Sequence, residues 1–363
     1  MPVSWCAPGR VNLIGEHTDY NGGFALPFAI EQACTATVER LPEPVLEISS
    51  AQLGSIRIEL AALRAGGQGW SAYAAGVGWA LRERGYSVPG LRIELDSTVP
   101  TGGGLSSSAG LVCSVATAVD DLLELELGPV RLLELTRSVE NDYVGAPTGG
   151  MDQLAALQCS AGNALFCDML TLETEQVPLP LESDGLAMLV IDTKAEHRHA
   201  DGEYRQRRAG CEEAAELLDV PLLRDIGVDQ LDAALAELPT DELRRYTRHV
   251  VTEDDRVLRT VELLRAGRLR EIGPLLTASH ASMREDYRIT IDELDVAVDA
   301  LLAAGAFGAR MTGGGFGGCV IALLASELVE PAAAAVRAAY TANGFRDPAA
   351  FQAQPCQGAH RVG

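Results

Sequence analysis

Lysine is nearly missing from this chain. Lys194 is the single lysine, so 28 of the 29 basic residues are arginine. A P-loop needs a lysine directly after its last glycine, and a protein kinase needs a strand lysine on the phosphates of ATP. Lys194 lies in an Ile-Asp-Thr-Lys-Ala-Glu segment, which meets neither requirement. The sequence therefore excludes both of these ways of binding a nucleotide.

Positive charge is scarce as well. The chain has 29 Lys and Arg residues against 51 Asp and Glu residues, a formal net charge of −22. Such a surface repels nucleic-acid phosphates and anionic lipids, and no arginine-rich stretch with interleaved aromatic residues offsets it. We therefore expect no nucleic-acid or membrane partner. An anionic substrate must be held by backbone dipoles, a metal ion or single arginines.

Long apolar runs and paired cysteines are also lacking. The apolar run at residues 296–307 is interrupted by Asp299 and is too short to cross a bilayer. The eight cysteines are dispersed without a CxxC pair, which is typical of small buried residues in a reducing compartment. The first residues contain no basic segment followed by an apolar one, so no signal peptide is expected. Together these features predict a cytoplasmic protein.

The chain is long enough for two domains, because its 363 residues exceed the length of an average domain, roughly 150 residues. Strand-like segments gather toward the ends of the chain, and residues 7–30 are expected to form short strands joined by tight turns. Residues 204–304 follow a mostly helical pattern. This distribution favours an α+β fold over an alternating parallel α/β sheet. The composition changes at about 165–185, so we expect domains at 1–175 and 176–363.

A strand, a glycine-rich loop and an apolar helix follow one another at residues 91–125. Three glycines at 102–104 are succeeded by a leucine and three serines. Consecutive glycines let the backbone expose its N–H groups to an anion, and the helix start adds a positive dipole end. The alternative is a serine-rich helix cap after a tight turn. The placement between strand and helix favours a phosphate-binding loop.

Residues 9–23, GRVNLIGEHTDYNGG, concentrate directional polar groups between glycines. Carboxylates in such a segment can accept hydrogen bonds from the vicinal hydroxyls of a polyol. A polar surface hairpin is the alternative, because Asp-Tyr-Asn-Gly-Gly is also a turn signal. His17 and Asp19 do not suffice for a zinc site, because further ligands at suitable spacing are missing.

Two further constellations lie later in the chain. Glu140 and Asp152 flank a helix end and a glycine-rich turn, so their carboxylates could converge on one site. Residues 313–318 contain five glycines in six positions, which would let the backbone pass close to a ligand or another segment. This segment is not a Rossmann nucleotide loop, because a strand-like run rather than a helix follows it.

With these motifs in this order, the chain resembles the galactokinase family of the GHMP small-molecule kinase superfamily. Residues 9–23 match the family's sugar-binding signature, residues 100–109 match the superfamily's phosphate loop, and residues 311–319 match its third, glycine-rich motif. The resemblance covers residues 7–362. It implies an N-terminal domain like domain 2 of ribosomal protein S5, a ferredoxin-like C-terminal domain, and an active site in the cleft between them.

The resemblance also implies roles for individual residues. Asp152 would face the anomeric hydroxyl of galactose, and Arg10 would lie between Asp152 and the γ-phosphate of ATP. Ser108 and Glu140 would hold Mg²⁺. The residues expected to bind the sugar are Glu16, His17, Thr18, Asp19 and Tyr204. The residues expected to bind ATP are Ser50, Gly102, Gly103, Gly104, Leu105, Ser106, Ser107 and Ser108.

The implied reaction is the ATP-dependent phosphorylation of D-galactose to α-D-galactose 1-phosphate, the first committed step of galactose catabolism, by a monomeric enzyme. Two other functions stay open on sequence alone. One is a kinase for N-acetylgalactosamine or another sugar, because the residues that shape the pocket at C2 cannot be identified from sequence. The other is a galactose sensor that kept the fold and lost turnover.

Overall fold

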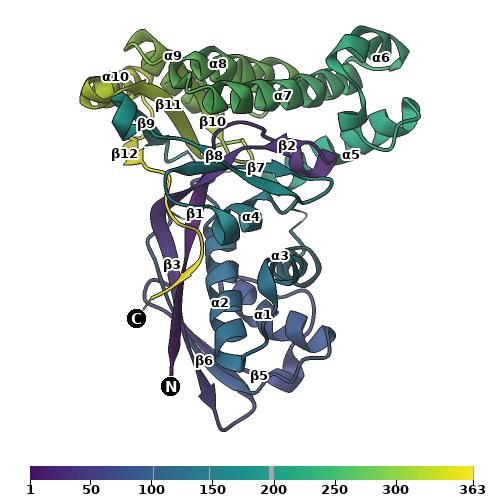
Figure 1. The fold of residues 1–363 in the computed structure, drawn as a ribbon, viewed down its shortest axis with the longest axis vertical. Helices are drawn as coiled ribbons and strands as arrows, with labels where there is room; N and C mark the ends of the chain where they lie inside the picture. The colour runs from purple at the N-terminus through teal and green to yellow at the C-terminus, as the bar shows by residue number, and fades with distance from the viewer. Residues whose placement is uncertain (101, 147, 196–199, 363) are drawn as a thin grey trace.

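The computed structural model describes residues 1–100, 102–146, 148–195 and 200–362, and Figure 1 shows its fold. Its strands are β1 (Val3–Asn12), β2 (Phe24–Ala25), β3 (Pro27–Leu41), β4 (Val45–Ser50), β5 (Gly54–Glu59), β6 (Gly90–Ser97), β7 (Asn163–Asp168), β8 (Thr174–Pro178), β9 (Leu186–Asp192), β10 (Gly308–Thr312), β11 (Cys319–Ala325), β12 (Ala349–Ala353) and β13 (His360–Arg361). Its α-helices are α1 (Ser71–Glu83), α2 (Ser107–Leu123), α3 (Gly128–Ser138), α4 (Met151–Gln158), α5 (Ala200–Leu217), α6 (Leu231–Glu237), α7 (Asp241–Arg265), α8 (Gly273–Ser282), α9 (Asp292–Ala303) and α10 (Val329–Asn343).

The first sheet has the strand order β13-β1-β3-β6-β4-β5, and helices α1 to α4 lie beside it in Figure 1. Strand β6 alternates apolar and polar residues, as expected where helices cover one face of a sheet and the other face meets solvent. The β1–β3 register shifts between Pro8 and Arg10, which marks a β-bulge. A bulge re-aims a side chain and bends its strand, and here it directs Arg10 toward the glycine loop.

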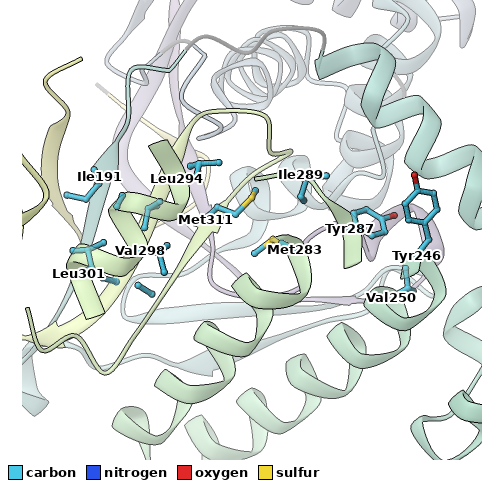
Figure 2. Packing of buried hydrophobic residues seen from close by; sticks show 14 of the residues in the cluster. Ile191, Tyr246, Val250, Met283, Tyr287, Ile289, Leu294, Val298, Leu301 and Met311 are labelled. Atoms are coloured by element: carbon cyan, nitrogen blue, oxygen red, sulfur yellow. The ribbon is translucent and has the colours of Figure 1, made fainter. Parts of the chain in front are cut away.

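A second sheet, β10-β11-β9-β12, lies at the other end of the molecule under α7, α8, α9 and α10 (Figure 1). Strand β9 is buried at every position, as expected for a central strand covered on both faces. Figure 2 shows Ile191 and Met311 of this sheet facing Leu294, Val298 and Leu301 of α9. A small third sheet, β2-β7-β8, lies between the two larger ones in the figure.

The α+β class with two domains is confirmed, and most expected elements form. Past α3 the chain continues as a π-helical turn, Val139–Val144. The strands expected to be short within residues 7–30 are longer, because β1 from Val3 to Asn12 pairs antiparallel with residues 27–38 of β3. The end of the chain returns to the first sheet, where β13 pairs with β1. The expected domain limits, 1–175 and 176–363, stay a prediction.

Among the described residues, no helix is both long and apolar enough to cross a membrane. The eight cysteines carry free thiols, and six of them are buried.

Candidate active site

An arginine–aspartate pair joins the first sheet to the start of α4. Arg10 donates from Nε to Oδ1 of Asp152 at 2.8 Å, and its NH2 nitrogen lies 2.7 Å from the same oxygen. The NH1 nitrogen of Arg10 donates to the carbonyl of Gly104 at 2.6 Å. Arg10 is 5% exposed, so its charge is fixed in place. One guanidinium therefore bridges the candidate base and the glycine loop, which lie 142 and 94 residues from Arg10 in the sequence.

The glycine loop approaches Asp152 from the other side. Ser106 has a left-handed backbone, with φ of 58°, and its hydroxyl donates to Oδ2 of Asp152. Both carboxylate oxygens of Asp152 thus accept hydrogen bonds, which orients the group and stabilises its negative charge. Helix α2 begins at the next residue, so its positive end faces the loop. Loop, base and arginine form one unit.

Glu140 lies behind this unit in the π-helical turn. It is 2% exposed, and burial together with the charge of Asp152 raises its pKa to about 7. Oε2 accepts from the Thr148 hydroxyl at 3.0 Å, and Ser108 also interacts with the carboxyl group. Oε1 is buried without a hydrogen-bond partner among the described residues.

A buried carboxylate oxygen without a partner is costly unless a ligand satisfies it. Magnesium prefers oxygen ligands and is commonly bound through one or two carboxylates plus substrate phosphates. Ser108 and Glu140 therefore fit the divalent cation that accompanies ATP. The described residues contain no cluster of three or more His, Cys, Asp or Glu side chains that could hold a metal ion by themselves.

The loop between β1 and β2 carries the predicted sugar-binding side chains. Glu16 is 2% exposed, and its Oε1 accepts from the backbone N–H of Gly313 at 2.8 Å and from the Thr312 hydroxyl at 3.2 Å. Arg310 places NH2 at 3.5 Å from the same oxygen. The third glycine motif thus holds Glu16 through one oxygen.

Asp19 lies against the turn that precedes Asp152. A methyl group built on Gly149 would lie 2.2 Å from Oδ2 of Asp19, so only glycine fits there. Burial and the nearby charge of Asp152 raise the pKa of Asp19 to about 6. Burial, followed by the charges of the nearby Asp19 and Asp152, raises the pKa of Tyr204 of α5 well above its ordinary value. Residues from both ends of the molecule therefore converge on one site.

Comparisons with known proteins agree over the whole chain. The family model of the galactokinase galactose-binding signature matches residues 1–40, and models of the N-terminal and C-terminal domains of GHMP kinases match residues 72–160 and 260–342. A galactokinase of Streptomyces coelicolor is 50% identical over 362 residues, which cover 99% of this chain and 94% of the relative. One of Mycobacterium tuberculosis is 44% identical over 99% of both chains.

The chain belongs to the galactokinase family.

Solved structures extend this result. The crystal structure of Lactococcus lactis galactokinase complexed with galactose is 33% identical, with a TM-score of 0.94 over 99% of this chain and 95% of that one. A mevalonate kinase with 19% identity and a TM-score of 0.69 shares the fold alone. The galactokinase-family site is thus built on a fold that serves several small-molecule kinases.

Two predicted sugar-binding residues of this galactokinase-family protein form hydrogen bonds with the chain's own backbone. Thr18 is fully buried, and its hydroxyl lies 2.9 Å from the carbonyl oxygen of Gly15 and 2.7 Å from that of Phe24, both within the loop. His17 donates from Nε2 to the Gly314 carbonyl at 3.2 Å. Sugar contacts by Thr18 and His17 stay predictions, and would require these bonds to be exchanged or shared.

His17 is also the first member of a buried polar chain. Burial lowers the pKa of His17 to about 3, so the ring is neutral and Nδ1 accepts from the Tyr20 hydroxyl at 2.8 Å. The Tyr20 oxygen then accepts from Tyr287 at 2.8 Å, and Tyr287 lies 3.1 Å from the thiol of Cys211. Tyr20 lies inside the signature, but nothing in the sequence pairs it with Tyr287.

The remaining predicted nucleotide residues lie at the end of an inner strand of the first sheet or in and just after the glycine loop. Ser50 ends β4, opposite Leu95 of β6, two residues before β6 leads into the glycine loop. Leu105 is buried and accepts from the backbone N–H of Arg10 at 3.1 Å, while Ser107 opens α2. A methyl group on Gly9 would lie 2.6 Å from the Leu105 carbonyl, so glycine permits this approach. Contacts of these residues with ATP stay predictions.

Proposed function

We propose that the protein transfers the γ-phosphoryl group of ATP to the C1 hydroxyl of D-galactose, giving α-D-galactose 1-phosphate and ADP. The observation that carries the proposal is the Arg10 bridge between Asp152 and the carbonyl of Gly104. It joins a carboxylate that can receive a hydroxyl proton to a loop that can hold phosphates. Phosphoryl transfer depends mainly on such positioning and on charge stabilisation.

Asp152 is the group that receives the C1–OH proton. Its carboxylate is oriented by Arg10 on one oxygen and by Ser106 on the other, so it presents its remaining lone pairs to the acceptor hydroxyl. Arg10 also offers positive charge at the side of the glycine loop, where negative charge develops during transfer. Proton acceptance and charge stabilisation are therefore coupled through one guanidinium.

Ser108 and Glu140 would hold Mg²⁺ at the phosphate side of the site. When bound, the ion neutralises charge on the β- and γ-phosphate oxygens. The buried Oε1 of Glu140, which has no partner among the described residues, supports this assignment. The backbone N–H groups of the loop and the start of α2 add further positive potential, which a protein of net charge −22 needs in order to bind ATP.

Asp19 and Glu16 are proposed to accept hydrogen bonds from separate hydroxyls of galactose, with Tyr204 completing the shell. A site that pairs with one particular hydroxyl rejects a sugar that misplaces it, because a buried polar group is then left without a partner. Glucose differs from galactose only at C4, so strong discrimination is expected.

Initial rates of ADP release with galactose, 2-deoxygalactose, glucose and N-acetylgalactosamine test the proposal. Galactose should be the preferred substrate, and Asp19→Ala should raise the KM for galactose steeply while the KM for ATP moves much less. Preference for N-acetylgalactosamine, or equal rates with glucose, would refute galactose as the substrate, and the protein would then be assigned only as a small-molecule kinase. Galactose binding without any ADP release would support a sensor instead.

The protein is further proposed to act as a monomer in the cytoplasm on small molecules alone, without a nucleic-acid or membrane partner. This proposal rests on the resemblance and on the acidic composition of the chain. Sedimentation equilibrium across a range of concentrations tests the monomer, and a dimer at micromolar concentration would contradict it.

A further inference from the structure

Helix α7 lies directly behind the sugar-binding loop, and three of its side chains hold that loop by its backbone. The three residues, His249, Glu253 and Asp254, lie within two turns of the helix. They contact backbone groups spread over residues 15–24. In Figure 1 the helix lies across the top of the molecule, with β2 beneath it.

His249 holds the loop at its centre. It is fully buried, and burial lowers its pKa to about 4, so the ring is neutral. Nε2 donates to the carbonyl of Glu16 at 3.1 Å, and Nδ1 lies 3.0 Å from the Ser282 hydroxyl. The ring also lies 4.3 Å from the ring of Tyr287 between centroids. Figure 2 shows Tyr287 beside Val250 and Tyr246 of the same helix.

Glu253 holds the start of the loop. Its Oε1 accepts from the backbone N–H of Gly15 at 3.0 Å and from the Ser279 hydroxyl at 2.6 Å. Burial alone would raise the pKa of Glu253, but Arg256 and Arg310 lower it to about 2, so the carboxylate is charged. Arg310 is fully buried and lies within 3.9 Å of Oε1 of Glu253 and 3.5 Å of Oε1 of Glu16.

Asp254 holds the end of the loop. Its Oδ1 accepts from the backbone N–H of Phe24 at 2.8 Å. A methyl group on Gly23 would lie 2.3 Å from that oxygen, so the backbone is pressed against the carboxylate. The loop is thus held at residues 15, 16 and 24, while the side chains of His17 and Asp19 lie between these anchors.

We propose that His249, Glu253 and Asp254 are positioning residues for the sugar: they set galactose affinity by fixing the backbone of residues 15–24 from behind, without touching either substrate. This inference rests on the function proposed above. A displacement of about 1 Å in a binding loop is enough to weaken hydrogen bonds to a ligand. The anchored backbone at residues 15, 16 and 24 is a separate segment from the phosphate loop between β6 and α2.

The first test compares two replacements of His249. His249→Leu removes the donor to the Glu16 carbonyl, whereas His249→Gln keeps an N–H donor at nearly the same distance from the backbone. We expect His249→Leu to raise the KM for galactose about tenfold, the scale of losing one buried hydrogen bond. The KM for ATP should change less than twofold, and His249→Gln should restore most of the galactose affinity.

Thr247→Val is the matched control, because Thr247 is a fully buried polar residue of α7 whose hydroxyl has no hydrogen-bond partner among the described residues. It should keep the parent KM values. Thermal unfolding of each variant separates stability from positioning. If His249→Leu lowers Tm but keeps the parent KM for galactose, or if His249→Gln is as impaired as His249→Leu, the inference is wrong.

A second pair of variants examines an independent anchor. Asp254→Ala removes the acceptor for the Phe24 N–H, while Asp254→Asn retains an oxygen in its place. Calorimetry of galactose binding without nucleotide should show several-fold weaker binding for Asp254→Ala than for Asp254→Asn. Equal affinities would contradict the role of Asp254. If the parent protein prefers another hexose, the proposed function fails, and the same ratios measured with that hexose still test the positioning role.

Discussion

The two glycine-rich segments of this protein have similar composition, but their most open and most crowded glycines have different surroundings. A methyl group added to Gly102 in the first segment would meet no described atom within 4 Å. In the second segment, a methyl group on Gly313 would lie 2.8 Å from the Gly104 carbonyl, and one on Gly315 would lie 2.6 Å from the Ile289 carbonyl. Gly102 thus has room for a ligand beside it, whereas Gly104, Gly313 and Gly315 lie with backbone close against backbone.

The difference shows that glycines have two physical roles in one active site. In the loop before α2 they expose N–H groups to an anion. After β10 they let the chain pass close enough for the Gly313 N–H to reach Glu16 and for the Gly314 carbonyl to reach His17. The second segment therefore shapes the sugar site by packing.

The largest effect should come from filling the packed segment. Gly315→Ala places a methyl group against the Ile289 carbonyl at a positive φ of 83°. Strain and overpacking together should cost about 4 kcal/mol of unfolding free energy. Gly102→Ala, at a φ of 74° but in open space, should cost only about 1 kcal/mol and act mainly on the KM for ATP.

Urea unfolding measures the free energy of unfolding of both variants. Gly162→Ala serves as the control, because Gly162 has a positive φ of 78° and open space around it in a distant turn. Equal losses of stability in all three variants would remove the contrast between the two segments.

The next largest effect concerns the carboxylate beside the open segment. Asp152→Asn should lower kcat at least about a hundredfold, the scale for losing an acid–base group, while galactose still binds. Single-turnover rates and calorimetry measure the two properties separately. Asp142→Asn is a control on an exposed aspartate of the π-helical turn. Near-normal turnover in a folded Asp152→Asn protein would refute the assigned role.

Ser108→Ala tests the role of the first glycine-rich segment in holding phosphate. Removing one oxygen ligand should raise the KM for Mg·ATP about tenfold, on the scale of a hydrogen bond to a charged group. Galactose affinity without nucleotide should be unchanged. Ser114→Ala is the control, because Ser114 lies on the same helix and its hydroxyl donates to the Leu111 carbonyl within that helix. Loss of galactose binding with normal ATP use would mean that the loop is wrongly assigned.

The smallest effect comes from the half-buried Asp19. Its pKa is raised from 3.8 to about 6, so the stability of the folded state is full below about pH 4 and falls as pH rises through 6. At pH 8 the free energy of unfolding of Asp19→Asn should therefore exceed that of the parent by about 1 kcal/mol, after allowance for solvent screening. The difference should vanish at pH 4, while galactose affinity falls. Urea unfolding at both pH values checks this.

Much of the site could be predicted because its residues lie in compact motifs. The strand at 91–97 and the helix after the glycines formed as expected, since hydrophobic period and turn residues act locally. Asp152 and Arg10 were predicted to meet and do so. His249 and Glu253 were missed, although a histidine and a glutamate one turn apart in an amphipathic helix were visible in the sequence.

By itself, the sequence determined the fold class, the family and the set of groups available for catalysis, because these depend on local patterns and residue types. Only the tertiary structure decided which groups are paired. It placed Ser106 on Asp152, filled both nitrogens of His17, and brought Arg310 and α7 behind the loop. These pairings join segments far apart in the chain, and burial makes them obligatory because a buried polar group without a partner is costly.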